Sequence, residues 1–154
     1  MELVDYYKAV KDTFAVLGRV EDGKDSNTDD LLVKDFYFTS MAQPKNSKVF
    51  CNIQVMLNKN SSRSRAWIAI RSWTELDKST PELKKEIDKI ANDENDDTNM
   101  KFLPPKSVVL VNIRGLSEPY STNDISFNKD LKELTKCFFD QMLKLQKLSD
   151  ASRA

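Results

Sequence analysis

The residue types in this chain of 154 residues exclude several common kinds of catalytic site. The chain has no histidine, so Ser-His-Asp catalysis, Cys-His catalysis and histidine-coordinated zinc are ruled out. It has only three glycines, and we expect neither a phosphate-binding loop nor a dinucleotide-binding fingerprint, since both need closely spaced glycines. The two cysteines, Cys51 and Cys137, cannot complete a four-ligand zinc site and are expected to be buried free thiols.

Acidic side chains offer no better candidate for a metal site or a reaction. Residues 25–36 and 93–104 begin with alternating acid and amide side chains, as calcium-binding loops do. Both segments lack the glycine at the sixth position and the acidic ligand at the twelfth, so we interpret them as solvated loops. We therefore expect no catalytic residue, no metal site and no cofactor.

The best candidates for function are aromatic and basic side chains in the middle of the chain. Trp67, Arg71 and Trp73 lie an even number of residues apart in a strand-like segment, which places them on one face of a strand. Trp and Arg often dominate binding energy because they combine a large rigid contact area with several hydrogen bonds. The preceding strand-like segment adds further side chains to this face. The predicted partner-binding residues are Phe50, Gln54, Met56, Trp67, Arg71 and Trp73.

Two alternatives to a protein-binding face remain open from the sequence. In the first, the aromatic side chains form a second core layer beneath other elements, and Arg71 reaches past them to water. In the second, the face binds nucleic acid, with Lys59, Arg63 and Arg65 contacting phosphates around a polar turn. Residues 31–73 hold seven basic side chains and one acidic one, but the net charge of zero differs from the basic character typical of nucleic-acid binders.

The spacing of apolar residues predicts the elements that position these side chains. Helical spacing predicts three helices, over residues 3–17, 81–90 and 128–148. Alternating or continuous apolar segments rich in β-branched and aromatic residues predict four strands, over residues 31–39, 48–57, 65–73 and 108–113. A short polar connection between the second and third strands favours antiparallel pairing.

The predicted fold is one α+β domain that spans residues 1–148 in the order α-βββ-α-β-α. We expect an antiparallel sheet of about four strands with helices packed on one side. Gly18 is expected to end the first helix in a left-handed conformation. Residues 21–30 are expected to form an exposed loop, and residues 149–154 to fray.

The order of these elements resembles that of two kinds of known protein. Its first six elements are similar to the core of a large nuclease superfamily, which holds a metal with an Asp and a Glu-x-Lys on adjacent strands. The strands over residues 48–57 and 65–73 contain no acid, so this resemblance implies at most a degenerate relative that binds nucleic acid. With its closing helix, the order is similar to small secretion chaperones that form dimers and bind extended segments of other proteins.

We expect a non-catalytic, intracellular binding protein of the adaptor, chaperone or inhibitor kind, with another protein as its partner. No apolar segment approaches the roughly 20 residues that cross a bilayer, and the first residues lack the features of a signal peptide, so we expect a cytoplasmic location. Phe139 and Leu143 form a second apolar ridge on the last helix, which is a candidate for self-association into a homodimer.

Overall fold

The computed structural model describes residues 2–58, 65–78, 80–91, 98–103, 107–116 and 125–153. The described residues form an α+β domain with three helices and a seven-stranded sheet, which confirms the predicted fold class but with more strands than expected. The helices are α1 (Leu3–Ala15), α2 (Pro81–Ala91) and α3 (Ile125–Arg153). The strands are β1 (Gly18–Asp22), β2 (Ser26–Asn27), β3 (Leu31–Ser40), β4 (Val49–Asn58), β5 (Arg65–Glu75), β6 (Thr98–Leu103) and β7 (Ser107–Gly115).

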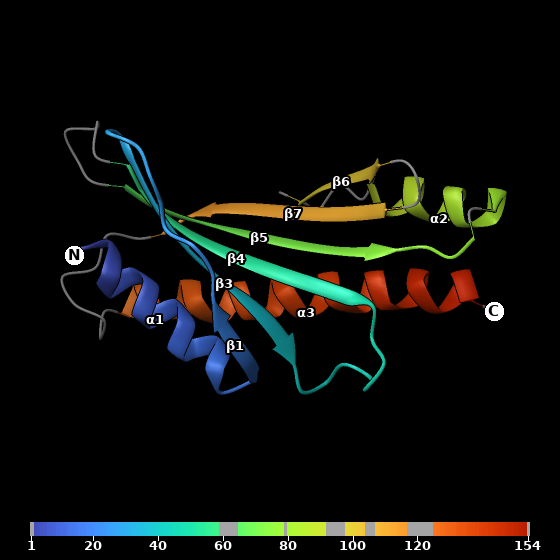
Figure 1. Cartoon of the computed structure of the whole chain (residues 1–154), viewed down its shortest axis with the longest axis horizontal. Helices are drawn as coiled ribbons and strands as arrows, with labels where there is room; N and C mark the ends of the chain where they lie inside the picture. The colour runs from blue at the N-terminus through green and yellow to red at the C-terminus, as the bar shows by residue number, and fades with distance from the viewer. Residues whose placement is uncertain are drawn as a thin grey trace.

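The sheet follows the order β1-β3-β4-β5-β7-β6, and the short β2 pairs with β3. Its pairings are antiparallel, as expected. In the middle of the sheet, Arg71 of β5 lies opposite Asn52 of β4 on one side and opposite Val111 of β7 on the other. Figure 1 shows the long strands running the length of the molecule, with α1 and α3 below them.

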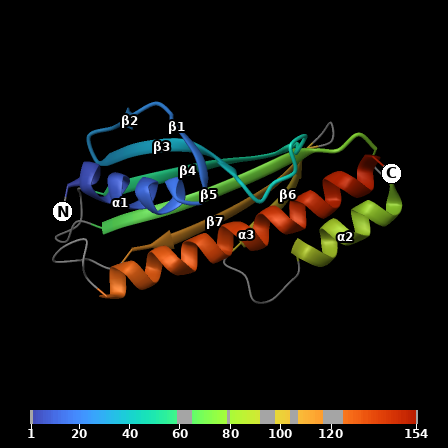
Figure 2. The ribbon, with the colours of Figure 1, turned by 90° about the horizontal axis from the view of Figure 1, so that it is seen from below.

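One face of the sheet packs against α1 and α3, as Figure 2 shows from the helix side. Alternate residues of β4, from Val49 to Leu57, are buried on this face, as the alternation predicted. At the centre of the core, the rings of Phe14 on α1, Phe38 on β3 and Phe138 on α3 pack edge to face with centroids 5.0 to 5.9 Å apart.

The middle helix α2 lies beside α3 and next to the edge strand β6. Its start agrees with the sequence, because the backbone N–H of Leu83 donates a hydrogen bond of 3.2 Å to the hydroxyl of Thr80. None of the described helices is both long enough and apolar enough to cross a membrane.

Three strands lie where the sequence did not predict them. The expected loop over residues 21–30 contains the end of β1 and all of β2, which both pair with the edge of β3. The strand β6 pairs with β7 at the other edge of the sheet. These segments have few of the β-branched and aromatic residues that signal strands, because their stability comes from backbone pairing with a neighbouring strand.

The helix α3 is longer than predicted at both ends, since it begins at Ile125 and continues to Arg153. The prediction that residues from 149 onward fray is therefore wrong as far as Arg153. Ser152 is fully buried, and its hydroxyl accepts a hydrogen bond of 3.2 Å from the backbone N–H of Asp77. Nε of Arg153 lies 3.3 Å from the carboxylate of Asp77. These contacts hold the last turn against the segment that follows β5.

Gly18 has a different role from the predicted one. The helix α1 ends at Ala15, and its C-cap residue, Val16, has right-handed backbone angles. Gly18 opens β1 opposite Ser40, in close contact with β3. A Cβ atom at this position would overlap the backbone oxygen of Thr39 and lie 2.9 Å from the Cα of Ser40. A side chain here therefore requires β1 to move away from β3.

We predict that Gly18→Ala lowers the free energy of unfolding by about 1–3 kcal/mol, because the added methyl group meets backbone atoms that cannot rotate aside. Urea denaturation followed by circular dichroism measures the loss. Gly115→Ala is the matched control, since a Cβ there would lie 3.4 Å from the nearest atom of the Trp67 ring, and we expect a change below about 1 kcal/mol. Equal losses in the two variants would contradict this role for Gly18.

Candidate binding face of the sheet

The face of the sheet turned away from α1 and α3 is called the outer face here, and no described helix packs on it. Its clearest members are Tyr37, Phe50 and Ile113, whose side chains are 48%, 49% and 52% exposed. Such large apolar side chains are uncommon on the solvent side of an antiparallel sheet. The strand register places on the outer face Tyr37, Phe50, Gln54, Met56, Trp67, Arg71, Trp73, Val109, Val111 and Ile113.

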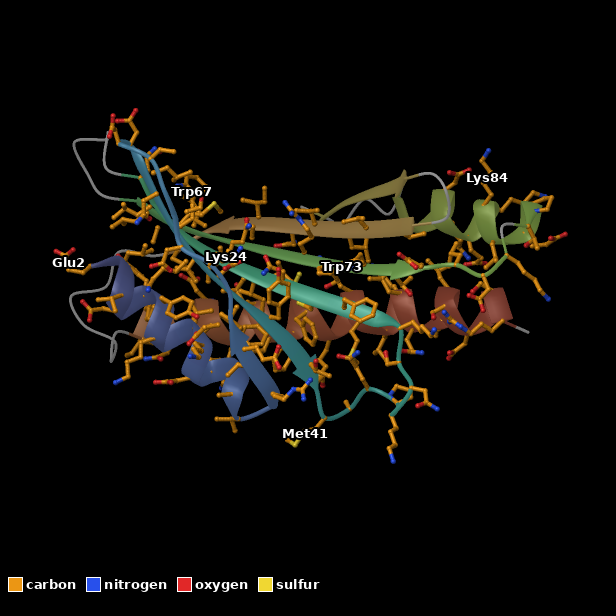
Figure 3. The ribbon with its side chains drawn as sticks, in the orientation of Figure 1. Glu2, Lys24, Met41, Trp67, Trp73 and Lys84 are labelled. Atoms are coloured by element: carbon orange, nitrogen blue, oxygen red, sulfur yellow. The ribbon has the colours of Figure 1, made fainter. Side chains whose placement is uncertain are left out.

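All six residues predicted to bind a partner lie on the outer face. The strand register places Phe50 opposite Trp73, and their ring centroids are 5.9 Å apart. It also places Met56 opposite Trp67, nearer the other end of β5. Both indole side chains are partly exposed, and Figure 3 shows them spaced along β5. Within the described residues, no second layer covers this face, in contrast to the first alternative considered from the sequence.

Arg71 lies in the middle of the outer face and is exposed. Along β5 its neighbours on this face are Ala69 and Trp73, and across the sheet they are Asn52 and Val111. Among the described residues, its guanidinium group makes neither a hydrogen bond nor an ion pair. An arginine in this state can bind a carboxylate through two parallel hydrogen bonds.

The side of the outer face nearest β3 is more polar. The side-chain amide of Asn52 donates hydrogen bonds to the Asp35 carboxylate at 2.9 Å and to the backbone oxygen of Phe36 at 3.4 Å. Asn52 is only 5% exposed, so we interpret its side-chain hydrogen bonds as stabilising the fold. The other carboxylate oxygen of Asp35 packs against Gly23, where a Cβ atom would overlap it. Asp35 and Asn52 therefore form a polar pair on the outer face, and the exposed Tyr37 lies opposite Asn52.

Four apolar residues of this face were not predicted from the sequence, and only for Tyr37 was a signal present. In β3, Phe36 and Phe38 are buried, so Tyr37 between them must point outward. In β7, Val108 and Leu110 are buried, which turns the outer-face residues of that strand the other way. Because β7 is apolar on both faces, its alternation is hidden in the sequence. The missed residues are Tyr37, Val109, Val111 and Ile113.

The basic residues predicted to contact nucleic acid cannot be placed on this face. Lys59 and Arg63 lie outside the described residues. The backbone of Arg65 belongs to β5, but its side chain also lies outside the described part of the structure. The second candidate function from the sequence therefore gains no support from these three positions.

The two residues of the ridge predicted for self-association, Phe139 and Leu143, differ in their burial. The Phe139 ring packs against Phe138 with centroids 5.3 Å apart and is partly buried in the core. Leu143 is 55% exposed, so it is the member of the pair that can meet another molecule. Homodimer formation through this ridge stays a prediction that depends on Leu143.

The cysteines are free, as expected, but only one of them is fully buried. Burial raises the pKa of the Cys51 thiol to about 12, so it stays protonated at neutral pH. Cys137 is partly exposed, which corrects the prediction that both thiols are buried.

A metal site requires a cluster of possible ligands, and a phosphate-binding loop requires a characteristic spacing of glycine and lysine. The described residues contain no group of three or more acidic or cysteine side chains that could hold a metal ion. Gly18, Gly23 and Lys24 have the spacing found in phosphate-binding loops, although the sequence was not expected to contain such a loop. Asp25 stands where such loops have Ser or Thr, and the segment continues into β2 instead of a helix, so the match lacks its structural context.

A cluster of charged groups on the helix side connects α1 to the sheet. The Tyr7 hydroxyl donates a hydrogen bond to the Asp22 carboxylate, and Nζ of Lys11 lies 2.6 Å from the same oxygen. Nζ of Lys34 lies 5.2 Å from the centroid of the Tyr7 ring and 3.3 Å from the Asp25 carboxylate. Burial, followed by the hydrogen bond to Asp22, raises the pKa of Tyr7, and hydrogen bonds from Lys11 and Tyr7 lower the pKa of Asp22. We interpret this cluster as a contact that positions α1.

Among the described residues, the outer face is thus the surface that gathers exposed aromatic, apolar and basic side chains. Comparison of the chain with protein-family models, with curated proteins and with solved structures found no match in any of the three. The chemistry of the outer face is therefore the basis for assigning a function.

We predict that Phe50→Ala changes the free energy of unfolding by less than about 1 kcal/mol, because the ring is half exposed and leaves no cavity. Phe36→Ala is the matched comparison on the neighbouring strand and the opposite face, where the ring is fully buried, and should cost about 3–5 kcal/mol. Urea denaturation compares the two. A large loss in Phe50→Ala would mean that the outer face is covered.

Alkaline titration tests the contact between α1 and the sheet. Because the pKa of Tyr7 is raised on folding, its contribution to stability is complete below the usual pKa of about 10 and is lost as the pH rises above it. We predict that the free energy of unfolding of the native sequence falls above about pH 10, and that Tyr7→Phe removes part of this fall. Urea denaturation at several pH values measures both. The same decline in the two proteins would contradict the assignment to Tyr7.

Proposed function

We propose that this protein is a non-catalytic binding protein, of the adaptor, chaperone or inhibitor kind, that uses the outer face to bind another protein. The single observation that carries this proposal is the group of Tyr37, Phe50 and Trp73, which no described helix covers, beside Arg71, which no described residue pairs. Aromatic and arginine side chains are enriched in protein interfaces and supply much of their binding energy. A sheet face with no partner would more commonly carry small polar side chains.

The charge of the outer face favours a protein over a nucleic acid. Single-stranded nucleic acid carries a phosphate charge at each nucleotide, and proteins that bind it follow this charge with several cations. Within the described residues, Arg71 shares the outer face with the acidic side chains of Asp35 and Glu75. A mixed surface of this kind suits a partner with both apolar and charged groups.

We propose a cytoplasmic location for the protein. Cys51 and Cys137 are both free thiols, which is the state favoured in a reducing compartment. This proposal is independent of the binding face and is tested by imaging the tagged protein in its own cells, where a secreted protein would instead be found in the medium.

We predict that the double variant Phe50→Ser, Arg71→Ser loses partner capture while its free energy of unfolding changes little, because both side chains are exposed. The measurement is cross-linked capture from an extract of the cells that make the protein, followed by quantitative mass spectrometry. Removing an interface residue of either type lowers the binding free energy enough to reduce the enrichment of the partner by roughly tenfold or more. Leu143→Ser is the matched control, since it removes an exposed apolar group from α3, on the opposite side of the sheet.

The outcomes of this experiment separate the candidate functions. Equal enrichment by the native protein and the double variant would refute binding through the outer face. Capture that is abolished by nuclease and falls steeply with salt would indicate nucleic acid instead. Loss in Leu143→Ser alone would place the binding surface on α3.

A further inference from the structure

We infer that the partner presents an extended segment with a carboxylate that binds Arg71 and with apolar side chains two residues before and two residues after it. This inference rests on the proposed function and specifies the partner of the same face. It follows from three properties of the outer face: the charge of Arg71, which no described residue pairs, the apolar groups on both sides of it, and the spacing of side chains along β5.

The first property requires an acidic group in the partner. A partner that covered the outer face with apolar groups alone would remove the Arg71 guanidinium from water without replacing its hydrogen bonds, which is strongly unfavourable. No described side chain of the protein satisfies this group. A carboxylate fits it best, because two oxygens can accept parallel hydrogen bonds from one guanidinium. With no acceptor for Arg71 among the described side chains, we infer that the acceptor comes from the partner.

The second and third properties set the pattern around the acid. On one side of Arg71 lie Trp73 and Phe50, and on the other lie Ile113, opposite Ala69, and the more distant Trp67. Residues on one face of a strand repeat every two positions, at about 6.6–6.8 Å. An extended partner segment has the same repeat, so apolar side chains two positions from its acid lie over the apolar groups on either side of Arg71.

Gln54 adds a group that can bind the backbone of such a segment. It lies opposite Ala69, in the pair that follows Asn52–Arg71 on the same face, and is partly exposed. In the part of the chain that the structure describes, its side-chain amide makes no hydrogen bond. An amide offers both a donor and an acceptor, which match the backbone of an extended segment.

A second copy of this chain is a poorer occupant of the outer face. In a two-fold dimer the same patch of each protomer meets itself. A two-fold axis through the middle of the face would bring the two Arg71 side chains together. Of the acidic residues named on this face, Asp35 already accepts a hydrogen bond from Asn52, and Glu75 lies four residues from Arg71 at the end of β5. Like charges opposed in an interface are unfavourable, so the charge pattern favours a different, acidic partner.

The test uses a library of random 12-residue peptides without tryptophan, displayed and selected against the immobilised full-length protein. The chain contains two tryptophans, Trp67 and Trp73, and both lie on the outer face, so peptide binding there is measured by tryptophan fluorescence. We expect the selected peptides to share an Asp or Glu with apolar residues two positions before and after it. We also expect the Phe50→Ser variant to bind them more weakly.

A double-mutant cycle then tests the contact with Arg71. Replacing the acid of a selected peptide by its amide should weaken binding to the native protein by roughly 10-fold to 100-fold, the range for a hydrogen bond to a charged group. The same replacement should have little effect on binding to Arg71→Gln. Lys147→Gln, which removes an exposed cation from α3, is the matched control and should retain the full difference.

The outcomes distinguish this inference from the proposed function. Peptides that depend on Phe50 but share no acid, or that lose nothing when their acid becomes an amide, would overturn the inference and leave binding by the outer face intact. A loss of equal size in native protein and Arg71→Gln would also overturn it, because the acid would then bind elsewhere. If no selected peptide depends on Phe50, or none is selected, both the inference and the proposed function fail.

Discussion

The edge-to-face packing of phenylalanine rings in the core determines how the rest of the chain is placed. Phe14 of α1 contacts Phe36 and Phe38 of β3 and Phe138 of α3, with ring centroids 5.1 to 6.0 Å apart. Because side chains alternate along a strand, burying Phe36 and Phe38 turns Tyr37 outward. The antiparallel register then determines which residues of β4, β5 and β7 share that outward face. The packing of one face of the sheet thus determines which residues lie on the other face.

Polar contacts along α3 fix this helix on the sheet. The Ser72 hydroxyl donates to the side-chain oxygen of Gln141 at 3.2 Å within the core, and Ser47 donates to Gln146 at 2.7 Å. Near the end of the helix, the hydroxyl of Ser152 accepts its hydrogen bond from the chain that follows β5. Hydrogen bonds between buried groups are directional, so they specify the position of the helix more narrowly than apolar packing does. The hydrogen bond of Ser152 also holds the last turn of α3 in place.

The distribution of charge distinguishes the outer face from the rest of the molecule. Lys11, Lys34 and Arg153 each lie within 2.6 to 3.3 Å of a carboxylate. Acidic segments on either side of the central strands thus neutralise some of the basic groups within the fold. Arg71 has no such partner among the described residues, and its neighbours on the outer face are Trp73, Val111, Ala69 and Asn52. An unpaired cation in an apolar surface is typical of a site that another molecule completes.

The sequence by itself determined the α+β class, the inward face of β4 and the six residues expected on the outer face, because these depend on a local repeat of two or 3.6 residues. Only the tertiary structure decided that no described helix covers Trp67 and Trp73, that β1 pairs with β3 through a close contact at Gly18, and that α3 continues to Arg153. Each of these depends on contacts between segments far apart in the chain. The physical reason is that the exposure of a side chain, the pairing of an edge strand and the end of a helix depend on residues that are close in space. The contact between Ser152 and Asp77 is an example, and no local repeat in the sequence encodes it.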